Sequence, residues 1–203
     1  MSFLDRFLPP KKSDIKEDSP AERYLEYWTN YFNAEPLFYR NESLTQGIPG
    51  VSTLVFKDFP EKGLITGLTY GLSLVKHPDW KNGRGELCIC VESESLDWAQ
   101  VAGYIANKLR GNCPFSYGNT INFGQPISND SEMDAFLVFA PGIFEDQKDY
   151  LDIDIGCEYK INVAALYPIY SEEIKVISEI GLEKFWHHPD FDMFDVNRAV
   201  ITD

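Results

Sequence analysis

The segment Glu86–Val91 (ELCICV) contains only apolar residues after its first position. A strand with one wet face alternates polar and apolar residues, whereas a strand covered on both faces is apolar throughout. We therefore expect this segment to be a central strand, with further structure packed on both faces of its sheet. Cys88 and Cys90 lie two residues apart, so their side chains share one face of the strand. We interpret them as small core thiols, with a metal-binding or redox pair as the alternative.

Several short apolar segments on either side predict more strands. They are rich in β-branched residues and are bounded by turn-forming residues, as in a meander of strands. A further segment alternates Leu151, Ile153 and Ile155 with Asp152 and Asp154, which is typical of a half-buried strand. The two aspartates are then its solvated side or, alternatively, a pair of acids. The other strand candidates lie at residues 51–56, 64–75, 120–123, 135–140 and 159–166.

Helical patterns interrupt these strands. Ser19 and Glu22 form a capping box, so a helix begins at residue 20. A second helix is expected at residues 95–110, and Ser171 is expected to cap a third. A shorter helical piece with Phe185 and Trp186 and an extended tail at residues 193–201 complete the chain.

The order of these elements predicts the fold class. Helices and strands do not alternate as βαβ units, so we expect an α+β fold, in which several helices flank a mostly antiparallel mixed sheet. A chain of 203 residues is the size of one domain. Because residues 9–18 (PPKKSDIKED) are polar and proline-led, we expect residues 1–18 to be a flexible N-terminal arm and residues 19–203 to be a single domain.

Composition and charge exclude several classes of function. No run approaches the roughly 18 apolar residues of a membrane-spanning helix. With 18 Lys and Arg against 32 Asp and Glu, the net charge is −14. Such a surface repels nucleic acid and anionic lipid, so neither is expected as a partner. The charge suits a basic protein partner, or alternatively it only keeps the chain soluble.

The N-terminus and the cysteines predict a cytoplasmic protein. Asp5 and Arg6 interrupt the first apolar run and Pro9 ends it, so the chain lacks the pattern of a secretory signal peptide. Its four cysteines form no dense disulfide framework.

No motif of the sequence predicts catalysis. A phosphate-binding GxxxxGK[ST] loop and a GxSxG nucleophile motif are both absent. Acidic clusters at residues 130–134 and 190–195 are weak calcium candidates without the glycine and closing glutamate of an EF-hand loop. We therefore expect no enzyme activity, no cofactor and no bound metal. A metal-dependent hydrolase that uses these clusters is the alternative.

The segment Leu166–Glu173 (LYPIYSEE), followed by Gly181, resembles the Pro-x-Tyr-x-Glu-Glu signature of the Suppressor of Fused domain family. Four more features occur in the family's order, so that the resemblance covers roughly residues 25–200. They are Gly85-Glu86-Leu87, a helix with Trp98-Ala99 and Tyr104, the segment Phe136–Gly142 with Glu145, and Asp195–Arg198. We expect the signature residues to build the fold: Glu86, Trp98, Tyr167, Pro168, Tyr170, Glu172, Glu173, Gly181 and Arg198.

The resemblance implies a protein-binding domain without catalytic chemistry. Short bacterial members resemble immunity proteins, which neutralise a cognate toxin of a polymorphic toxin system, so we expect a protein partner such as a basic toxin. A general regulatory module that binds by strand addition is the alternative. In animal members the partner adds a strand near a helix tyrosine and a Gly-Asp pair, and Asn119 replaces the acid here. The matching candidate binding residues are Tyr104, Gly118, Asn119, Thr120 and Asn122, with residues 120–123 as an edge strand. In the alternative interpretation this segment is an internal strand and Tyr104 is a core residue.

Overall fold

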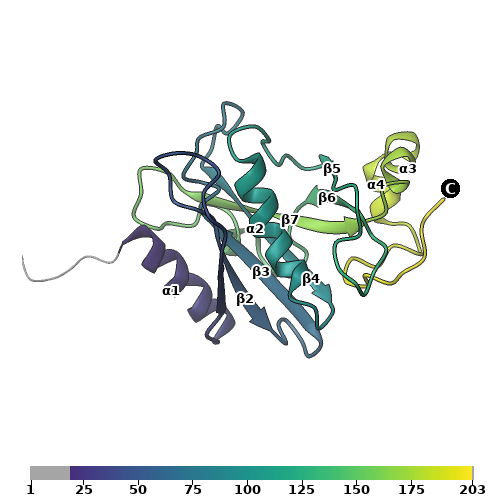
Figure 1. Cartoon of the computed structure of the whole chain (residues 1–203), viewed down its shortest axis with the longest axis horizontal. Helices are drawn as coiled ribbons and strands as arrows, with labels where there is room; N and C mark the ends of the chain where they lie inside the picture. Colours follow the sequence, from purple (N-terminus) through teal and green to yellow (C-terminus); the bar gives the residue numbers. More distant parts are fainter. Residues whose placement is uncertain (1–18, 203) are drawn as a thin grey trace, which may run out of the picture.

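The computed structural model of the protein describes residues 19–202, which form a seven-stranded sheet with helices packed against it (Figure 1). The expected arm, residues 1–18, lies outside the described residues. The strands are β1 (Leu37–Arg40), β2 (Ser52–Lys57), β3 (Leu64–Tyr70), β4 (Arg84–Glu92), β5 (Thr120–Asn122), β6 (Ala135–Phe139) and β7 (Ile161–Ile169). The helices are α1 (Pro20–Phe32), α2 (Asp97–Leu109), α3 (Glu173–Ile180) and α4 (Leu182–Trp186), and residues 147–149 form a 3₁₀ turn. Within residues 19–202, no helix combines the length and the apolar character that crossing a membrane requires.

Strand β4 lies in the middle of the sheet, whose order is β1-β2-β3-β4-β7-β6-β5. It pairs antiparallel with β3 and parallel with β7, so that Cys88 lies opposite both Leu68 and Ala165. The remaining neighbours pair antiparallel. The prediction of an α+β fold with a mostly antiparallel mixed sheet is confirmed.

Side chains of β4 alternate between two buried layers. Leu87 and Ile89 pack in one core cluster with Trp98 of α2, whereas Cys88 packs in the other with Trp28 of α1. Helix α2 crosses one face of the sheet, while α1 belongs to the opposite layer (Figure 1). A strand that is dry on both faces needs apolar residues at every position, which explains the sequence ELCICV.

The two cysteines of β4 are buried free thiols. Burial raises the pKa of the Cys88 thiol well above its ordinary value and that of Cys90 to about 12. Because the thiolate is the form that binds metals and attacks electrophiles, thiols that stay protonated are inert. The interpretation as core thiols fits the structure.

The predicted strand at residues 151–155 is wrong. Ile153 and Ile155 are buried and Asp152 and Asp154 exposed, as the alternation implies, but only an isolated bridge links Ile153 to Ile161. Asp152 has φ 56°, a left-handed conformation that interrupts an extended ladder. The exposed aspartates are the solvated side of an irregular segment.

The start of the third helix also differs from the prediction. Ser171 does not cap it, because its N–H and hydroxyl both donate to the Asp134 carboxylate, at 2.7 and 2.8 Å. Glu172 occupies the N-cap position, and its side chain makes no capping hydrogen bond. Instead, Glu173 in the first turn accepts the N–H of Tyr170 at 3.0 Å.

The strands on the β1 side of the sheet differ from the prediction as well. Strand β1 was not expected from the sequence, and β3 ends at Tyr70 rather than at residue 75. Residues 71–73 turn away from the sheet because their backbone N–H groups bond to the buried carboxylate of Glu86.

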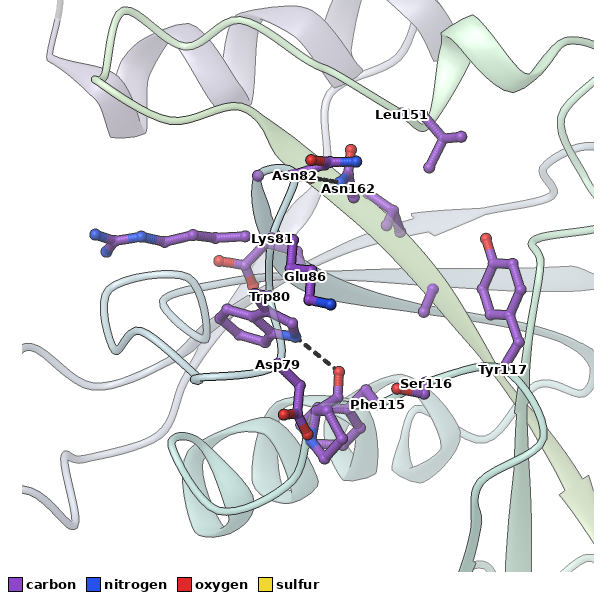
Figure 2. Close-up of a pocket in the computed structure, with 16 residues that line it drawn as sticks. Asp79, Trp80, Lys81, Asn82, Glu86, Phe115, Ser116, Tyr117, Leu151 and Asn162 are labelled. Carbon is purple, nitrogen blue, oxygen red and sulfur yellow. Dashed lines mark hydrogen bonds between the residues drawn. The ribbon is translucent and has the colours of Figure 1, made fainter.

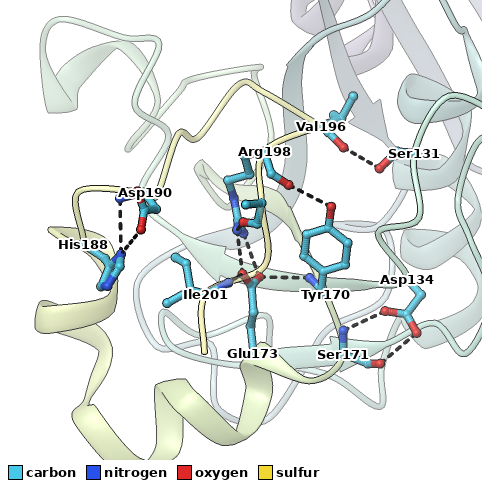
Figure 3. Close-up of polar contacts among 11 residues, drawn as sticks. Ser131, Asp134, Tyr170, Ser171, Glu173, His188, Asp190, Val196, Arg198 and Ile201 are labelled. Atoms are coloured by element: carbon cyan, nitrogen blue, oxygen red, sulfur yellow. Dashed lines mark hydrogen bonds and ion pairs between the residues drawn. The ribbon is translucent and has the colours of Figure 1, made fainter. Parts of the chain in front are cut away.

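Glu173 and Arg198 form a fully buried ion pair that ties the C-terminal tail to α3 (Figure 3). The guanidinium donates to both carboxylate oxygens, at 2.5 and 2.7 Å. Glu173 also accepts the N–H of Ile201 at 2.9 Å, and the Tyr170 hydroxyl donates to the carbonyl of Arg198 at 2.8 Å. The tail is therefore held by hydrogen bonds to signature residues of β7's end and of α3.

The other signature residues of this region shape the backbone. The Tyr167 hydroxyl accepts the Gly142 N–H and donates to the Ala140 carbonyl, both at 2.7 Å, and burial raises the pKa of this phenol. Pro168 pairs with Phe136 of β6 and lies beyond Ala165, where the pairing of β7 with β4 ends. Gly181 ends α3 with φ 86°, which glycine adopts at no steric cost.

Glu86 holds the turn that follows β3. Its carboxylate is fully buried and accepts hydrogen bonds from the Thr69 and Ser73 hydroxyls, both at 2.7 Å, and from the backbone N–H groups of Gly71 and Ser73, at 2.8 and 3.1 Å. Burial raises the pKa of Glu86, while the hydrogen bonds from Ser73, Thr69 and Gly71 counteract part of that rise.

We predict that Glu173→Gln destabilises the fold by about 3–5 kcal/mol, because it leaves the Arg198 charge buried without its partner. Urea unfolding measures this difference. Glu172→Gln is the matched control: the neighbouring carboxylate is exposed, so its removal changes the unfolding free energy by less than about 0.5 kcal/mol. Equal stabilities of the two variants would contradict the prediction.

We also predict that Glu86 makes stability depend on pH. Its pKa in the folded state lies above the ordinary value of 4.5, so folding favours the protonated form. The contribution of Glu86 to stability is complete below that ordinary value and is lost as the pH rises through the folded-state pKa. The penalty of Glu86→Gln in urea unfolding is therefore larger at about pH 5 than at about pH 8. A penalty that grows with pH would show the sign to be wrong.

Candidate protein-binding site

Strand β5 lies at one edge of the sheet and pairs only with β6, with Thr120 opposite Leu137 and Asn122 opposite Ala135. The alternative interpretation of this segment as an internal strand is therefore wrong. The strand ends at Asn122, one residue earlier than expected.

The backbone of β5 turns unpaired groups toward the open edge. Val138 N–H donates to the Asn119 carbonyl, and Phe123 N–H donates to the Asp134 carbonyl, both at 2.8 Å. Bonded and non-bonded positions alternate along an antiparallel ladder, so Thr120 and Asn122 direct their N–H and C=O groups away from β6. These two residues offer ladder positions to an added strand.

A groove of about 370 Å³ lies beside this edge, between β5 and α2. The Tyr104 ring forms one wall and meets the Phe123 ring edge-to-face, with 5.9 Å between centroids. Ile121 and Leu109 add apolar surface, and Lys108 supplies a cation. The groove can therefore hold an apolar side chain that projects from a strand paired with β5.

Helix α2 is held close to the sheet at the residue before Tyr104. A Cβ at Gly103 would lie 2.2 Å from the Thr53 hydroxyl oxygen of β2, so only glycine allows this approach. Tyr104 is 39% exposed, and its hydroxyl accepts the Lys108 ammonium at 3.2 Å. The alternative interpretation of Tyr104 as a core residue is wrong.

Gly118 and Asn119 form the turn that leads into β5. Gly118 has φ 88° and donates its N–H to the Val138 carbonyl at 2.8 Å. The Asn119 side-chain oxygen accepts the Ser116 N–H at 2.9 Å. At this position the amide stabilises the turn and brings no charge to the edge.

Sequence reasoning missed several residues of this surface. Lys108 and Leu109 line the groove with Tyr104, and Phe123, which belonged to the expected edge strand at residues 120–123, supplies a further wall. A signal was available for two of them: Lys108 lies four residues after Tyr104 on one helix face, and Phe123 alternates with Ile121 on one strand face.

The acidic clusters serve the fold. Asp130 accepts the Trp98 indole N–H at 3.1 Å and the Ser93 hydroxyl at 2.5 Å. Burial raises the pKa of Asp130, but hydrogen bonds from Ser128, Ser93 and Trp98 outweigh this and lower it. In the second cluster, an Asp192 oxygen accepts two backbone N–H groups. Across residues 19–202, no three His, Cys, Asp or Glu side chains come together as a metal site would require.

Figure 2 shows a second hollow, of about 360 Å³, beside the start of β4. Several of its polar side chains are engaged within the fold: the Trp80 indole N–H donates to the Pro114 carbonyl at 2.8 Å, and the Asn162 side-chain amide donates to the Asn82 carbonyl. Glu86 is occupied by the hydrogen bonds described above. The other carboxylate that lines this hollow is Asp79, whose side chain is exposed and lies 3.8 Å from the imidazole of His77.

Solved structures share this fold. A Suppressor of fused homologue from Neisseria gonorrhoeae matches with a TM-score of 0.67 and 16% identity, over 89% of this chain and 96% of the other. Drosophila Suppressor of Fused matches with a TM-score of 0.60 and 11% identity, over 87% of this chain and 50% of the other. A chain of the Sufu–Fu complex matches with a TM-score of 0.55 and 12% identity, over 87% of this chain and 89% of the other. No curated protein sequence matches the chain.

The sequence profile of the Suppressor of fused protein (SUFU) family matches residues 47–199, from just before β2 to the tail residue that follows Arg198. This match covers well over half of the 203 residues. The chain belongs to the Suppressor of fused protein family.

Proposed function

We propose that this chain is a non-enzymatic protein-binding domain that takes an extended segment of its partner as an additional strand on β5. The observation that carries the proposal is the pair of outward-facing ladder positions at Thr120 and Asn122, next to the groove of Tyr104 and Phe123. An added strand gains affinity from backbone hydrogen bonds and specificity from such pockets. Membership of a protein-binding family and the similarity to a chain of the Sufu–Fu complex support a protein partner.

The composition of the edge defines the partner segment further. Three apolar walls of the groove, Tyr104, Ile121 and Phe123, suit one apolar side chain of the added strand. A third hollow, of about 420 Å³, lies where the start of β6 meets the end of β7 and includes the exposed carboxylates Glu132 and Glu172. Lys108 lines the groove itself, so the apolar residue of the segment belongs there, whereas the net charge of −14 on the whole chain favours basic residues elsewhere in the segment.

We further propose that the partner is a basic toxin and that the domain is its immunity protein, which masks the toxin's active site in a cytoplasmic complex. The strongly acidic composition supports a basic partner, because opposite net charges speed encounter and disfavour other partners. A general regulatory module with the same edge would bind an endogenous protein instead. Side chains of the acidic clusters are hydrogen-bonded within the fold, so the clusters do not distinguish an immunity protein from a regulatory module. They also give no support to the alternative of a metal-dependent hydrolase.

We predict that Thr120→Pro abolishes strand addition and leaves the fold intact. Proline at position 120 removes one of the two N–H groups that point to the open edge, and an edge position that faces away from β6 tolerates proline. Peptides selected from a displayed random library on the full chain are expected to carry Lys or Arg beside an apolar residue, and to lose at least about tenfold in affinity for Thr120→Pro. Thr120→Ser keeps the N–H and is the matched control. Selected peptides that bind Thr120→Pro as tightly as the wild type would refute the site.

We predict that co-expression with the toxin encoded beside this gene protects the cell, and that the purified complex forms more slowly as salt is raised. Charge steering weakens as the screening length falls from about 10 Å at 0.1 M salt to about 3 Å at 1 M, and stopped-flow association rates measure this. Absence of protection and of a complex would refute the immunity role. A rate independent of salt would refute the basic partner.

A further inference from the structure

Basic side chains gather at one hollow of a chain that is otherwise strongly acidic. The hollow has a volume of about 640 Å³ and lies beside the start of β4, next to the hollow of Figure 2, with which it shares Trp80 and Arg84. Four of the fourteen Lys and Arg residues within residues 19–202 line it: Lys76, Lys81, Arg84 and Lys160. None of them lines the groove beside Tyr104, so this basic hollow is a separate surface.

Three of these cations are available to a ligand. Lys76 and Lys81 are exposed, and within residues 19–202 their ammonium groups make no ion pair or hydrogen bond. The Arg84 guanidinium lies 3.8 Å from the centre of the Tyr159 ring and donates to the Ser73 carbonyl at 2.9 Å. A guanidinium that is held by stacking on a ring loses little freedom when its remaining N–H groups bind a carboxylate or a phosphate.

Hydrogen bonds between neighbouring segments hold the walls of the basic hollow together. Arg84 N–H donates to the Lys160 carbonyl at 2.8 Å, and the Asn162 side-chain amide donates to the Asn82 carbonyl (Figure 2). The oxygen of the same side chain accepts the Asp152 N–H at 2.8 Å. Three segments of the chain thus meet at Asn162. Because the hollow is formed before any ligand arrives, binding does not have to order its walls.

The turn before β4 adds uncharged donors to the cations. Within the described part of the chain, the backbone N–H groups of Lys81, Asn82 and Gly83 donate to no protein acceptor. Gly83 has φ 89°, and a Cβ at this position would lie 2.7 Å from the Lys160 carbonyl, so the turn requires glycine. Backbone N–H groups and cations that lie together form strong hydrogen bonds to an oxyanion such as phosphate.

The basic hollow also holds two carboxylates and an aromatic ring. Asp152 and Glu158 line it and are exposed, and within residues 19–202 their carboxylates have no ion-pair or hydrogen-bond partner. Carboxylates accept hydrogen bonds from sugar hydroxyls and repel phosphate, so they suit a ligand whose hydroxyls and phosphate lie apart. The half-buried Trp80 ring supplies a surface on which a planar ring stacks. Cations, carboxylates and a ring together match a phosphate, hydroxyls and a base.

We propose that the basic hollow binds a small phosphorylated sugar, either free or as part of a nucleotide. The phosphate contacts Lys76, Lys81 and Arg84. The sugar hydroxyls donate to Asp152 and Glu158. A phosphate monoester carries a charge of about −1.5 to −2 at pH 7, which suits several cations better than the single charge of a carboxylate does. The volume of about 640 Å³ lies within the range of about 300–1,000 Å³ that is usual for small-molecule sites.

The net charge of −14 opposes this binding only at long range. At physiological salt, exposed charges farther apart than about 8 Å are largely screened, so the groups that line the hollow dominate. Of the acids close by, Asp154 is already paired with Lys160 at 2.5 Å. A nucleic acid carries phosphates far beyond such a hollow, so the repulsion expected from the composition still applies to it. The inference therefore concerns a small ligand and does not depend on what binds at β5.

Calorimetric titration of the full chain with ribose 5-phosphate, adenosine monophosphate (AMP) and adenosine tests the site. We expect the two phosphates to bind and adenosine, which lacks the phosphate, not to bind. Tighter binding of AMP than of ribose 5-phosphate assigns the Trp80 ring to the base, whereas equal affinities assign the hollow to the sugar phosphate alone. The proposal is overturned if neither phosphate binds at millimolar concentration, or if adenosine binds as tightly as AMP.

Two charge reversals separate the effect of the hollow from that of the net charge. Lys81→Glu places a carboxylate beside the phosphate and is expected to raise the dissociation constant of both phosphates at least about tenfold. Lys184→Glu is the matched control: Lys184 is exposed on α4 outside the hollow, so its reversal changes the net charge equally and the dissociation constant by less than about twofold. Urea unfolding checks that both variants fold. Equal losses in the two variants, or no loss in Lys81→Glu, would reject this site.

Discussion

Strand β4 has to be excluded from water on both faces of the sheet. This constraint determines which surfaces of the sheet remain accessible to a partner. Its residues pack alternately against the layers of α1 and α2, and it joins the antiparallel β1–β4 meander to β7 through a parallel pairing. Covering both faces uses up the apolar surface of the helices. What remains accessible on the sheet is its two edges, β1 and β5, where backbone groups have no partner on one side. These edges are where an extended segment of a partner could pair with the sheet, as the proposed function requires.

The buried polar side chains serve the same constraint. A dry sheet must end in turns whose backbone N–H groups cannot reach water, and each unsatisfied group costs about 1–3 kcal/mol. Glu86 satisfies such groups after β3, and Glu173 satisfies those of Tyr170 and Ile201 after β7. Arg198 then balances the charge of Glu173. The family signature is thus largely a set of side chains that terminate strands.

The sequence predicted most of the features that depend on one helix or strand alone. It failed where residues distant in the sequence compete for the same hydrogen-bonding groups. ELCICV and the Ser19–Glu22 capping box were predictable because their patterns reflect their own surroundings, and the box forms as expected. Ser171 has the intrinsic preference of a cap, but Asp134, 37 residues away, takes its hydroxyl and N–H. Strand β1 has too few residues to carry a periodic signal and exists because β2 supplies its partner. The groove could be predicted only in part: the Tyr104 position came from the resemblance and Phe123 belonged to the expected edge strand, whereas the contact between their rings depends on how α2 packs beside β5.

Two open edges on one small sheet would ordinarily invite aggregation, although both edge strands are short, with four residues in β1 and three in β5. The acidic composition offers a physical answer. A charge of −14 makes random encounters between copies repulsive, so an edge pairs only where local complementarity outweighs this repulsion. At β5, a basic partner of the proposed kind would supply this local complementarity. The net charge that disfavours unspecific pairing therefore also narrows the range of partners that can bind at β5.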